Sequence, residues 1–275
     1  MKQLARSRPF PLYRAVYTTI MVVLALVVTP TFAVDSDLAE AQDPEAKSIL
    51  MKMAGHLAKA PAFSVTLSSS YDAIQEDGQR IEFGEKRRIL LQRPNRFRVE
   101  VVRSDGDRAL LLFDGQRLTA FKARDNVFAR TERSGTADEA IVYIVRNLQM
   151  TLPLARMFRT DFPTALQKKI VSIRYVEENF LFDVITDCLV ARMADVDFQI
   201  WIAQGEQPLP HRVVLTYKNA PGQPQFRAEL TDWDISPKVE DDDFSFKPPE
   251  GAEQIPLLTP VRPKGSLPIP KGDKQ

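Results

Sequence analysis

The sequence predicts an α+β fold: one large, curved antiparallel sheet of about eleven strands, a barrel or partial barrel, covered by an N-terminal helix and an inserted helical segment. Short runs of alternating apolar and polar residues recur along the chain, and turn-forming pairs such as Asp114-Gly115 separate them. Two segments with helical periodicity interrupt these runs. Because strands joined by short turns pair antiparallel, the chain should build one sheet whose apolar face needs a cover.

Residues 1–33 have the organisation of a signal peptide. Four basic residues precede the uncharged run 15–28, and small residues near Ala33 provide a cleavage site. No cysteine follows, as a lipoprotein signal would require. A membrane span needs about 20 residues, and only the longer stretch 13–32 reaches that length, so an uncleaved inner-membrane anchor is the alternative. We expect a periplasmic protein whose mature chain begins near Val34.

Composition argues against several classes of function. Cleavage after Ala33 would leave 33 basic and 36 acidic residues, and this net charge of −3 argues against nucleic-acid binding. Cys188 is the only cysteine and lies in an apolar run, so we expect a core residue. The two histidines, His56 and His211, do not suggest a metal site, and no nucleotide-binding motif is present. We therefore expect no enzyme, no metal and no cofactor.

The predicted domain spans residues 43–255. A helix should begin after Asp43, an N-cap followed by proline, and end before Pro61. The period of the apolar residues then changes from 3.6 to 2, which indicates strands. Turns such as Pro94-Asn95 and Asp125-Asn126 divide this part into six strands, at about 63–72, 81–92, 97–104, 109–113, 117–122 and 127–132.

The second strand leaves its register open. Counted in steps of two from Phe83, Glu85 and Arg87 fall on the apolar face. A bulge at Gly84 would shift the register and place the neighbouring basic residues there instead. We expect a bulge with the charges directed outward.

The second half repeats the strand pattern after a helical insertion. Thr136 and Glu139 match a capping box, and apolar residues at helical spacing continue to Phe162. Residues 256–275 are rich in proline without periodicity and should form a disordered tail. Between them we expect five strands, at about 170–176, 180–190, 196–203, 210–218 and 225–235.

Three motifs, taken in order, resemble the LolA-type superfamily of periplasmic lipoprotein carriers. They are LLQRPNRFRVEVV (90–102), LLFDGQRLTAFKARDNVFA (111–129) and FSFKPPEGA (244–252). The segment 201–212 departs from the carriers themselves. It is more similar to an uncharacterised branch of that superfamily, predicted to be periplasmic and known as a domain of unknown function.

The resemblance implies a half-barrel around an apolar cavity with helices as a lid. The arginine that latches the lid by bonding helix carbonyls falls on Arg93, and a cavity phenylalanine falls on Phe97. The alternatives are a solvated strand end and an ordinary core residue. Together with these two, we expect the inward apolar side chains of sheet and lid to bind the ligand: Phe63, Val65, Leu67, Phe83, Leu91, Val99, Ile141, Ile144, Val145, Leu148, Phe198, Ile200 and Leu215.

The predicted function is non-catalytic. A monomer would carry a lipid, a lipoprotein acyl chain or another hydrophobic or amphiphilic molecule, and a membrane protein would act as donor or acceptor. The alternative is a periplasmic envelope-stress sensor or interaction protein that uses the same fold to bind a membrane partner. An open apolar cavity would favour the carrier, and a retained partner protein without extractable lipid would favour the sensor.

Overall fold

The structure, a computed structural model, describes residues 42–180 and 182–257. The predicted signal peptide, residues 1–33, lies outside these residues. So does the predicted tail, apart from Pro256 and Leu257, and Leu257 packs partly buried against the core.

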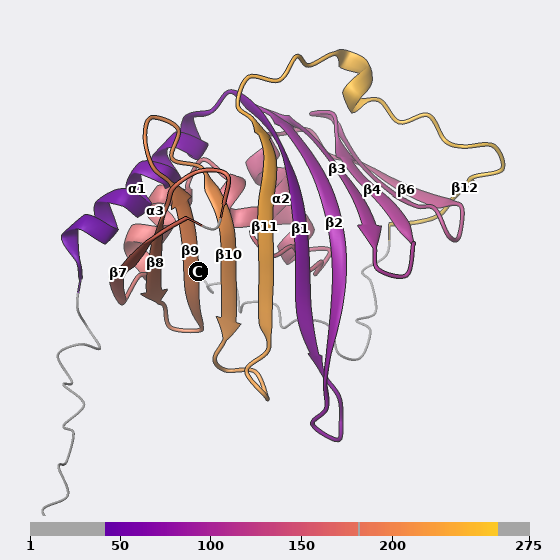
Figure 1. The fold of residues 1–275 in the computed structure, drawn as a ribbon. Coiled ribbons are helices and arrows are strands. Elements are labelled where there is room, and N and C mark those ends of the chain that lie inside the picture. Colours follow the sequence, from indigo (N-terminus) through magenta and orange to yellow (C-terminus); the bar gives the residue numbers. More distant parts are fainter. Residues whose placement is uncertain (1–41, 181, 258–275) are drawn as a thin grey trace, which may run out of the picture. The chain divides into compact units, whose positions relative to one another are not determined.

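One twelve-stranded sheet dominates the fold (Figure 1). The strand order is β12-β6-β5-β4-β3-β2-β1-β11-β10-β9-β8-β7, and every pair except β12–β6 is antiparallel. This arrangement confirms the predicted half-barrel. The strands are β1 (Ala62–Ile74), β2 (Arg80–Gln92), β3 (Arg96–Arg103), β4 (Arg108–Phe113), β5 (Arg117–Lys122), β6 (Val127–Glu132), β7 (Ser172–Asn179), β8 (Thr186–Arg192), β9 (Val196–Ala203), β10 (Pro210–Tyr217), β11 (Gln225–Asp234) and β12 (Glu253–Gln254).

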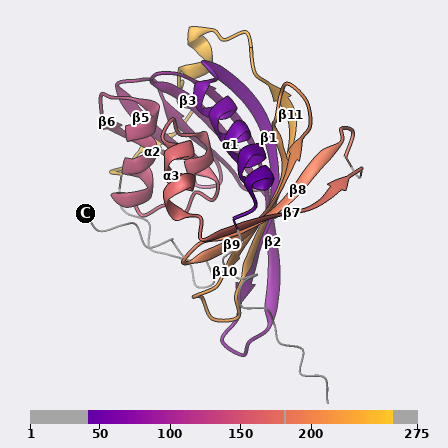
Figure 2. The same ribbon diagram turned by 90° about the vertical axis from the view of Figure 1, so that its left-hand side faces the viewer.

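The helices all lie on one side of the sheet (Figure 2). Helix α1 (Pro44–Lys59) precedes β1, and its N-cap Asp43 accepts bonds from two backbone amides of the first turn, as predicted. Between β6 and β7 lies the inserted segment, residues 137–169, which contains α2 (Ala137–Arg146), the 3₁₀ turn η2 (Ala155–Phe158) and α3 (Phe162–Lys169). The capping box of Thr136 and Glu139 is present at the start of α2. The segment leaves the sheet near one edge and returns at the other.

The C-terminal segment, residues 236–254, runs from β11 to β12 and contains the 3₁₀ turn η3 (Asp241–Phe244). Its strand β12 was not predicted, because two residues that pair parallel to β6 have no periodicity to read. The predicted start of the strand at 180–190 was wrong. Strand β8 begins at Thr186, and the apolar residues before it form bends, where the ring of Phe182 lies 6.0 Å from that of His211.

The predicted bulge at Gly84 was wrong. Strands β1 and β2 pair without a register shift along their whole length, with Ser70 opposite Gly84 and Leu67 opposite Arg87. Glu85 and Arg87 therefore share the inner face with Leu67, and they form an ion pair in which each side chain is 11% exposed. The pairing offsets the cost of placing either charge there, so no bulge is needed.

Candidate functional site

The inner face of the sheet is apolar across most of its width. Cross-strand partners share a face, so the register defines its rows. Phe63 pairs with Leu91, and Leu91 pairs with Phe97. Phe97 in turn pairs with Phe113, and none of these four side chains is more than 3% exposed. On the other half of the sheet, Ile200 pairs with Val213 and Leu189 in the same way.

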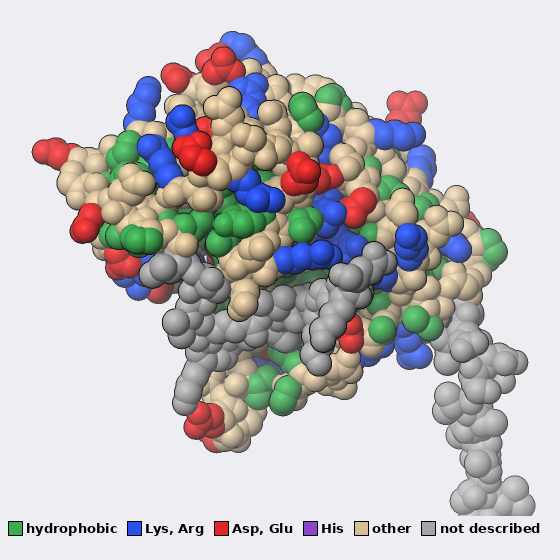
Figure 3. Space-filling view, turned by 180° about the vertical axis from the view of Figure 1, so that it is seen from behind, with side chains coloured by type: hydrophobic (Ala, Val, Ile, Leu, Met, Phe, Trp, Pro, Cys, Tyr) green, Lys and Arg blue, Asp and Glu red, His purple; other side chains and the backbone are tan. Residues whose placement is uncertain are grey.

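Helix α1 and the inserted segment bury this face. One apolar cluster joins side chains of α1, α2, η2 and α3 to both halves of the sheet. At its centre the ring of Phe63 lies 5.4 Å from Phe158 of η2 and 5.7 Å from Trp233 of β11. Figure 3 views this side of the molecule, where apolar side chains are exposed between charged ones.

Most predicted ligand-binding residues come together in this cluster. Val99 and Leu215 are partly buried against it. Among the described residues, Phe83 and Val145 are not part of it, and Phe83 is 42% exposed near the far end of the β1–β2 hairpin. The buried members are Phe63, Val65, Leu67, Leu91, Phe97, Ile141, Ile144, Leu148, Phe198 and Ile200.

Arg93 ties the helices to the sheet. From the turn between β2 and β3, its Nε donates to the Ala60 carbonyl at 3.1 Å and its Nη2 to the Leu57 carbonyl at 3.2 Å. Both carbonyls belong to the C-terminal end of α1, where helix carbonyls lack intrahelical partners. Nη2 also donates to the Phe158 carbonyl of η2 at 2.9 Å. A single guanidinium thus joins α1 and the inserted segment.

The same guanidinium lies beside the start of α2. Its Nη1 is 3.7 Å from Oδ1 of Asp138, and the other carboxylate oxygen accepts the Thr160 amide at 3.0 Å. The Arg93 side chain is only 12% exposed. Burial lowers the pKa of Arg93 and Asp138 opposes that effect, yet an arginine remains charged in proteins. The amide of Ala137 adds a bond to the Pro94 carbonyl at 2.9 Å.

The inner face becomes polar towards the β1–β2 turn. Beyond the apolar rows come the Glu85–Arg87 ion pair and Tyr71, whose ring lies 5.9 Å from that of Phe83. Burial raises the pKa of the Tyr71 hydroxyl, and the charge of Glu85 raises it further. The inner face therefore has a long apolar part and a short polar end.

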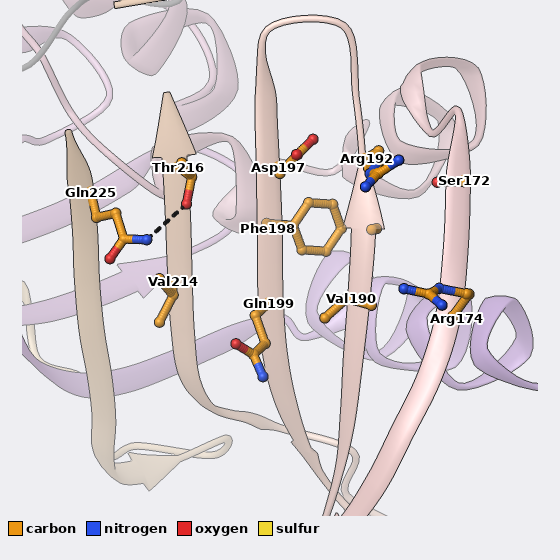
Figure 4. Close-up of a pocket in the computed structure, with 11 residues that line it drawn as sticks. Ser172, Arg174, Val190, Arg192, Asp197, Phe198, Gln199, Val214, Thr216 and Gln225 are labelled. Carbon is orange, nitrogen blue, oxygen red and sulfur yellow. Dashed lines mark hydrogen bonds between the residues drawn. The ribbon is translucent and has the colours of Figure 1, made fainter. Parts of the chain in front are cut away.

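Two pockets open on the outer face, the face of the sheet opposite the helices α1, α2 and α3. The smaller, of about 280 Å³, crosses β7 to β11, where Arg174 and Arg192 extend from neighbouring strands (Figure 4). The larger, of about 700 Å³, lies over β2 to β5 beside the C-terminal segment. The sequence analysis identified neither pocket. The available signal was the set of basic residues at outward positions of successive strands, such as Arg88, Arg98 and Arg108.

Three other features of the described residues concern metal binding, the cysteine thiol and membrane-spanning helices. Within the described ranges no group of three or more His, Cys, Asp and Glu side chains could hold a metal ion. Cys188 is fully buried, as predicted, and burial raises the pKa of its thiol. Among residues 42–257 that are described, no helix has the length and apolarity to cross a membrane.

The chain is similar to solved structures from several bacteria. An uncharacterised conserved protein from Thermus thermophilus has 11% identity and a TM-score of 0.45, over 77% of this chain and 99% of that one. MucB in its complex with MucA from Pseudomonas aeruginosa has 15% identity and a TM-score of 0.41, over 74% of this chain and 61% of that one. A LolA superfamily protein from Nitrosomonas europaea has 10% identity and a TM-score of 0.36, over 73% of this chain and 97% of that one.

No curated protein matches the chain. A family model described as a predicted periplasmic protein of unknown function matches residues 46–258, which include almost all of the described sheet and helices. This match confirms the predicted periplasmic location and the predicted membership of an uncharacterised family known as a domain of unknown function. The chain belongs to the DUF2092 family of predicted periplasmic proteins.

Proposed function

We propose that the protein binds a lipid, a lipoprotein acyl chain or another amphiphile between the inner face of the sheet and the inserted segment, without catalysing a reaction. The observation that carries the proposal is the position of Arg93. One guanidinium holds α1, η2 and the start of α2 together over the buried apolar cluster of the inner face. Such bonds are strong, yet all of them break together when one side chain moves.

The division of the inner face supports an amphiphile as the ligand. Apolar side chains such as Phe97 and Ile144 contact hydrocarbon without leaving polar groups unpaired. The polar end at Tyr71, Glu85 and Arg87 would face the headgroup. Because the inner side chains are packed in this structure, entry of a ligand requires the inserted segment to move away from the sheet.

The alternative function is binding of a membrane partner. Among the solved structures similar to this chain is that of MucB, which was solved in a complex with MucA. Under this alternative the inner face would remain a filled core. The two functions are distinguished by whether the purified protein retains a lipid or a partner protein.

The experiment has two stages. Mass spectrometry of an organic extract of the protein identifies a retained lipid, and displacement of a fluorescent fatty acid measures affinity. We then compare two substitutions on α2, Ile144→Asp and Val142→Asp. The side chain of Ile144 is fully buried in the cluster, whereas that of Val142 is only partly buried. For a carrier, Ile144→Asp weakens fatty-acid binding at least tenfold and Val142→Asp does not, while both retain a cooperative thermal transition.

Two outcomes contradict the carrier. The parent protein binds no fatty acid and yields no lipid, or Ile144→Asp unfolds the whole domain because it buries an unpaired charge in a static core. Recovery of a membrane protein without extractable lipid would favour the partner-binding function instead.

A further inference from the structure

The larger outer pocket is a groove whose walls come from four strands and the C-terminal segment. We call it the basic groove. It has a volume of about 700 Å³ and lies on the opposite face of the sheet from the helices. Its lining includes five cationic side chains and one carboxylate, Glu100. The cations are Lys86, Arg88, Arg98, Arg108 and Lys247.

This charge is a local feature. The whole chain has 37 basic and 36 acidic residues, so an average surface of this protein is close to neutral. The single carboxylate of the groove is already engaged, because Arg98 donates to Glu100 through Nε at 2.9 Å and through Nη2 at 2.8 Å. The groove therefore carries an excess of four positive charges that its own residues leave unbalanced.

The remaining cations are exposed and unpaired. Among the described residues, none of them forms an ion pair or donates a side-chain hydrogen bond; these are Lys86, Arg88, Arg108 and Lys247. Four like charges in one groove repel one another, and an arrangement of this kind attracts anions.

The sheet register fixes how these charges are spread. Lys86 and Arg108 both pair with Val102, one from each side, so the row places a cation, an apolar side chain and a cation in sequence. Two strand spacings separate the outer members, roughly 10 Å at the backbone. Val102 is 43% exposed between them. Arg88 lies in the next row, opposite Glu100, and Lys247 approaches from the C-terminal segment.

We propose that the basic groove docks the protein on the anionic surface of a lipid bilayer, with lipid phosphates between these side chains. Separate cations on different strands suit several headgroups side by side better than one small anion, which needs donors that converge. The exposed Val102 and the partly buried Phe121 suit contact with the apolar parts of the headgroup region. The periplasm is bounded by membranes, so such a surface is within reach of the protein.

This docking surface is distinct from the proposed ligand site. The groove and the apolar cluster occupy opposite faces of the sheet, so either can function if the other does not. Loss of fatty-acid binding tests the inner face, and loss of vesicle binding tests the groove.

The experiment measures co-sedimentation of the natively processed protein with vesicles of phosphatidylcholine, alone or mixed with phosphatidylglycerol. Neutralisation of two groove cations, Lys86→Gln with Arg108→Gln, should weaken binding to the anionic vesicles about 30-fold. The melting temperature of this double variant should equal that of the parent, because neither Lys86 nor Arg108 has a side-chain partner among the described residues.

The matched control is Arg174→Gln with Arg192→Gln. These two arginines are also exposed on the outer face and also lack ion pairs within the described part of the chain (Figure 4). The double substitution changes the net charge equally, but Arg192 and Arg174 lie five and six strand spacings from β2, roughly 24 and 29 Å along the sheet, against a Debye length of about 8 Å in physiological salt. The control should bind anionic vesicles as the parent does.

Several results would overturn the proposal. One is that anionic vesicles do not retain the parent at all. Another is that both double variants lose binding equally, which would indicate net charge rather than the groove. Binding of inorganic phosphate that depends on Lys86 and Arg108, without vesicle binding, would assign the groove to a soluble anion. Binding of polyglutamate but not vesicles would assign it to an acidic protein.

Discussion

Replacement of Arg93 by leucine removes the three hydrogen bonds by which this side chain joins α1 and η2 to the turn between β2 and β3. Three carbonyls lose a charged donor, those of Leu57, Ala60 and Phe158. At roughly 1 kcal/mol net for each bond, the loss is about 3 kcal/mol. If the inserted segment opens independently of the sheet, this loss falls on the opening step and raises the population of the open form about 150-fold.

Hydrogen exchange measured by mass spectrometry separates this opening from global unfolding. In Arg93→Leu, amides of α2 and η2 should exchange up to about 150-fold faster, whereas those of β1 and β2 should change far less. The matched control is Arg96→Leu. Within the described residues the hydrogen bonds of this guanidinium go to the side chains of Gln92 and Asp241, at 2.7 and 2.6 Å, and it also lies over the ring of Phe244, so it bonds neither α1 nor η2. An equal loss of protection in strands and helices would refute the reasoning, since Arg93 would then belong to one indivisible core.

Two further predictions concern acid stability and export. Asp72, with a side chain 2% exposed, lies 2.8 Å from Arg80 and 3.0 Å from Arg227. Burial alone would raise its pKa, but the bonds from Arg227 and the Gln225 amide and the charges of both arginines lower it overall. Its stabilising contribution is therefore present above the unfolded pKa of about 3.9 and is lost as the pH falls through the lower folded value. Asp72→Asn should cost about 2–3 kcal/mol in urea unfolding at pH 7 and progressively less as the pH falls below about 3.9, and a cost that does not change with pH would contradict this. For export, the intact mass of the native protein should correspond to a chain that begins near Val34, and a full-length mass in the membrane fraction would indicate an uncleaved anchor.

Local signals in the sequence were sufficient for most of the fold. Asp43 before proline marked the start of α1, and the capping box at Thr136 marked the start of α2. Alternation and turn residues located ten of the antiparallel strands closely, because each strand carries its own period of two and its own turn. The start of β8 was placed too early, since apolar residues in a bend have the same composition as a strand.

Features that depend on pairing between distant segments could not be read in this way. Glu85 and Arg87 point inward because β2 pairs with β1 in an unbroken register. Gly84 is compatible both with that register and with a bulge, so the sequence alone does not decide between them. The basic groove depends on which rows of β2, β3 and β4 meet, and on the return of the C-terminal segment beside them. The contacts of Arg93 were anticipated only through a family resemblance, since the carbonyl of Phe158 lies 65 residues away in the chain.

The inserted segment joins β6, next to one edge of the sheet, to β7, which forms the opposite edge. A segment anchored at both ends spans the half-barrel as a belt, and it cannot swing aside on a single hinge. It can rise from the sheet only when slack is released along its length or when the two edges approach each other. Stronger curling of the sheet would loosen the belt and flattening would tighten it. The curvature of the sheet would then govern access to its own inner face.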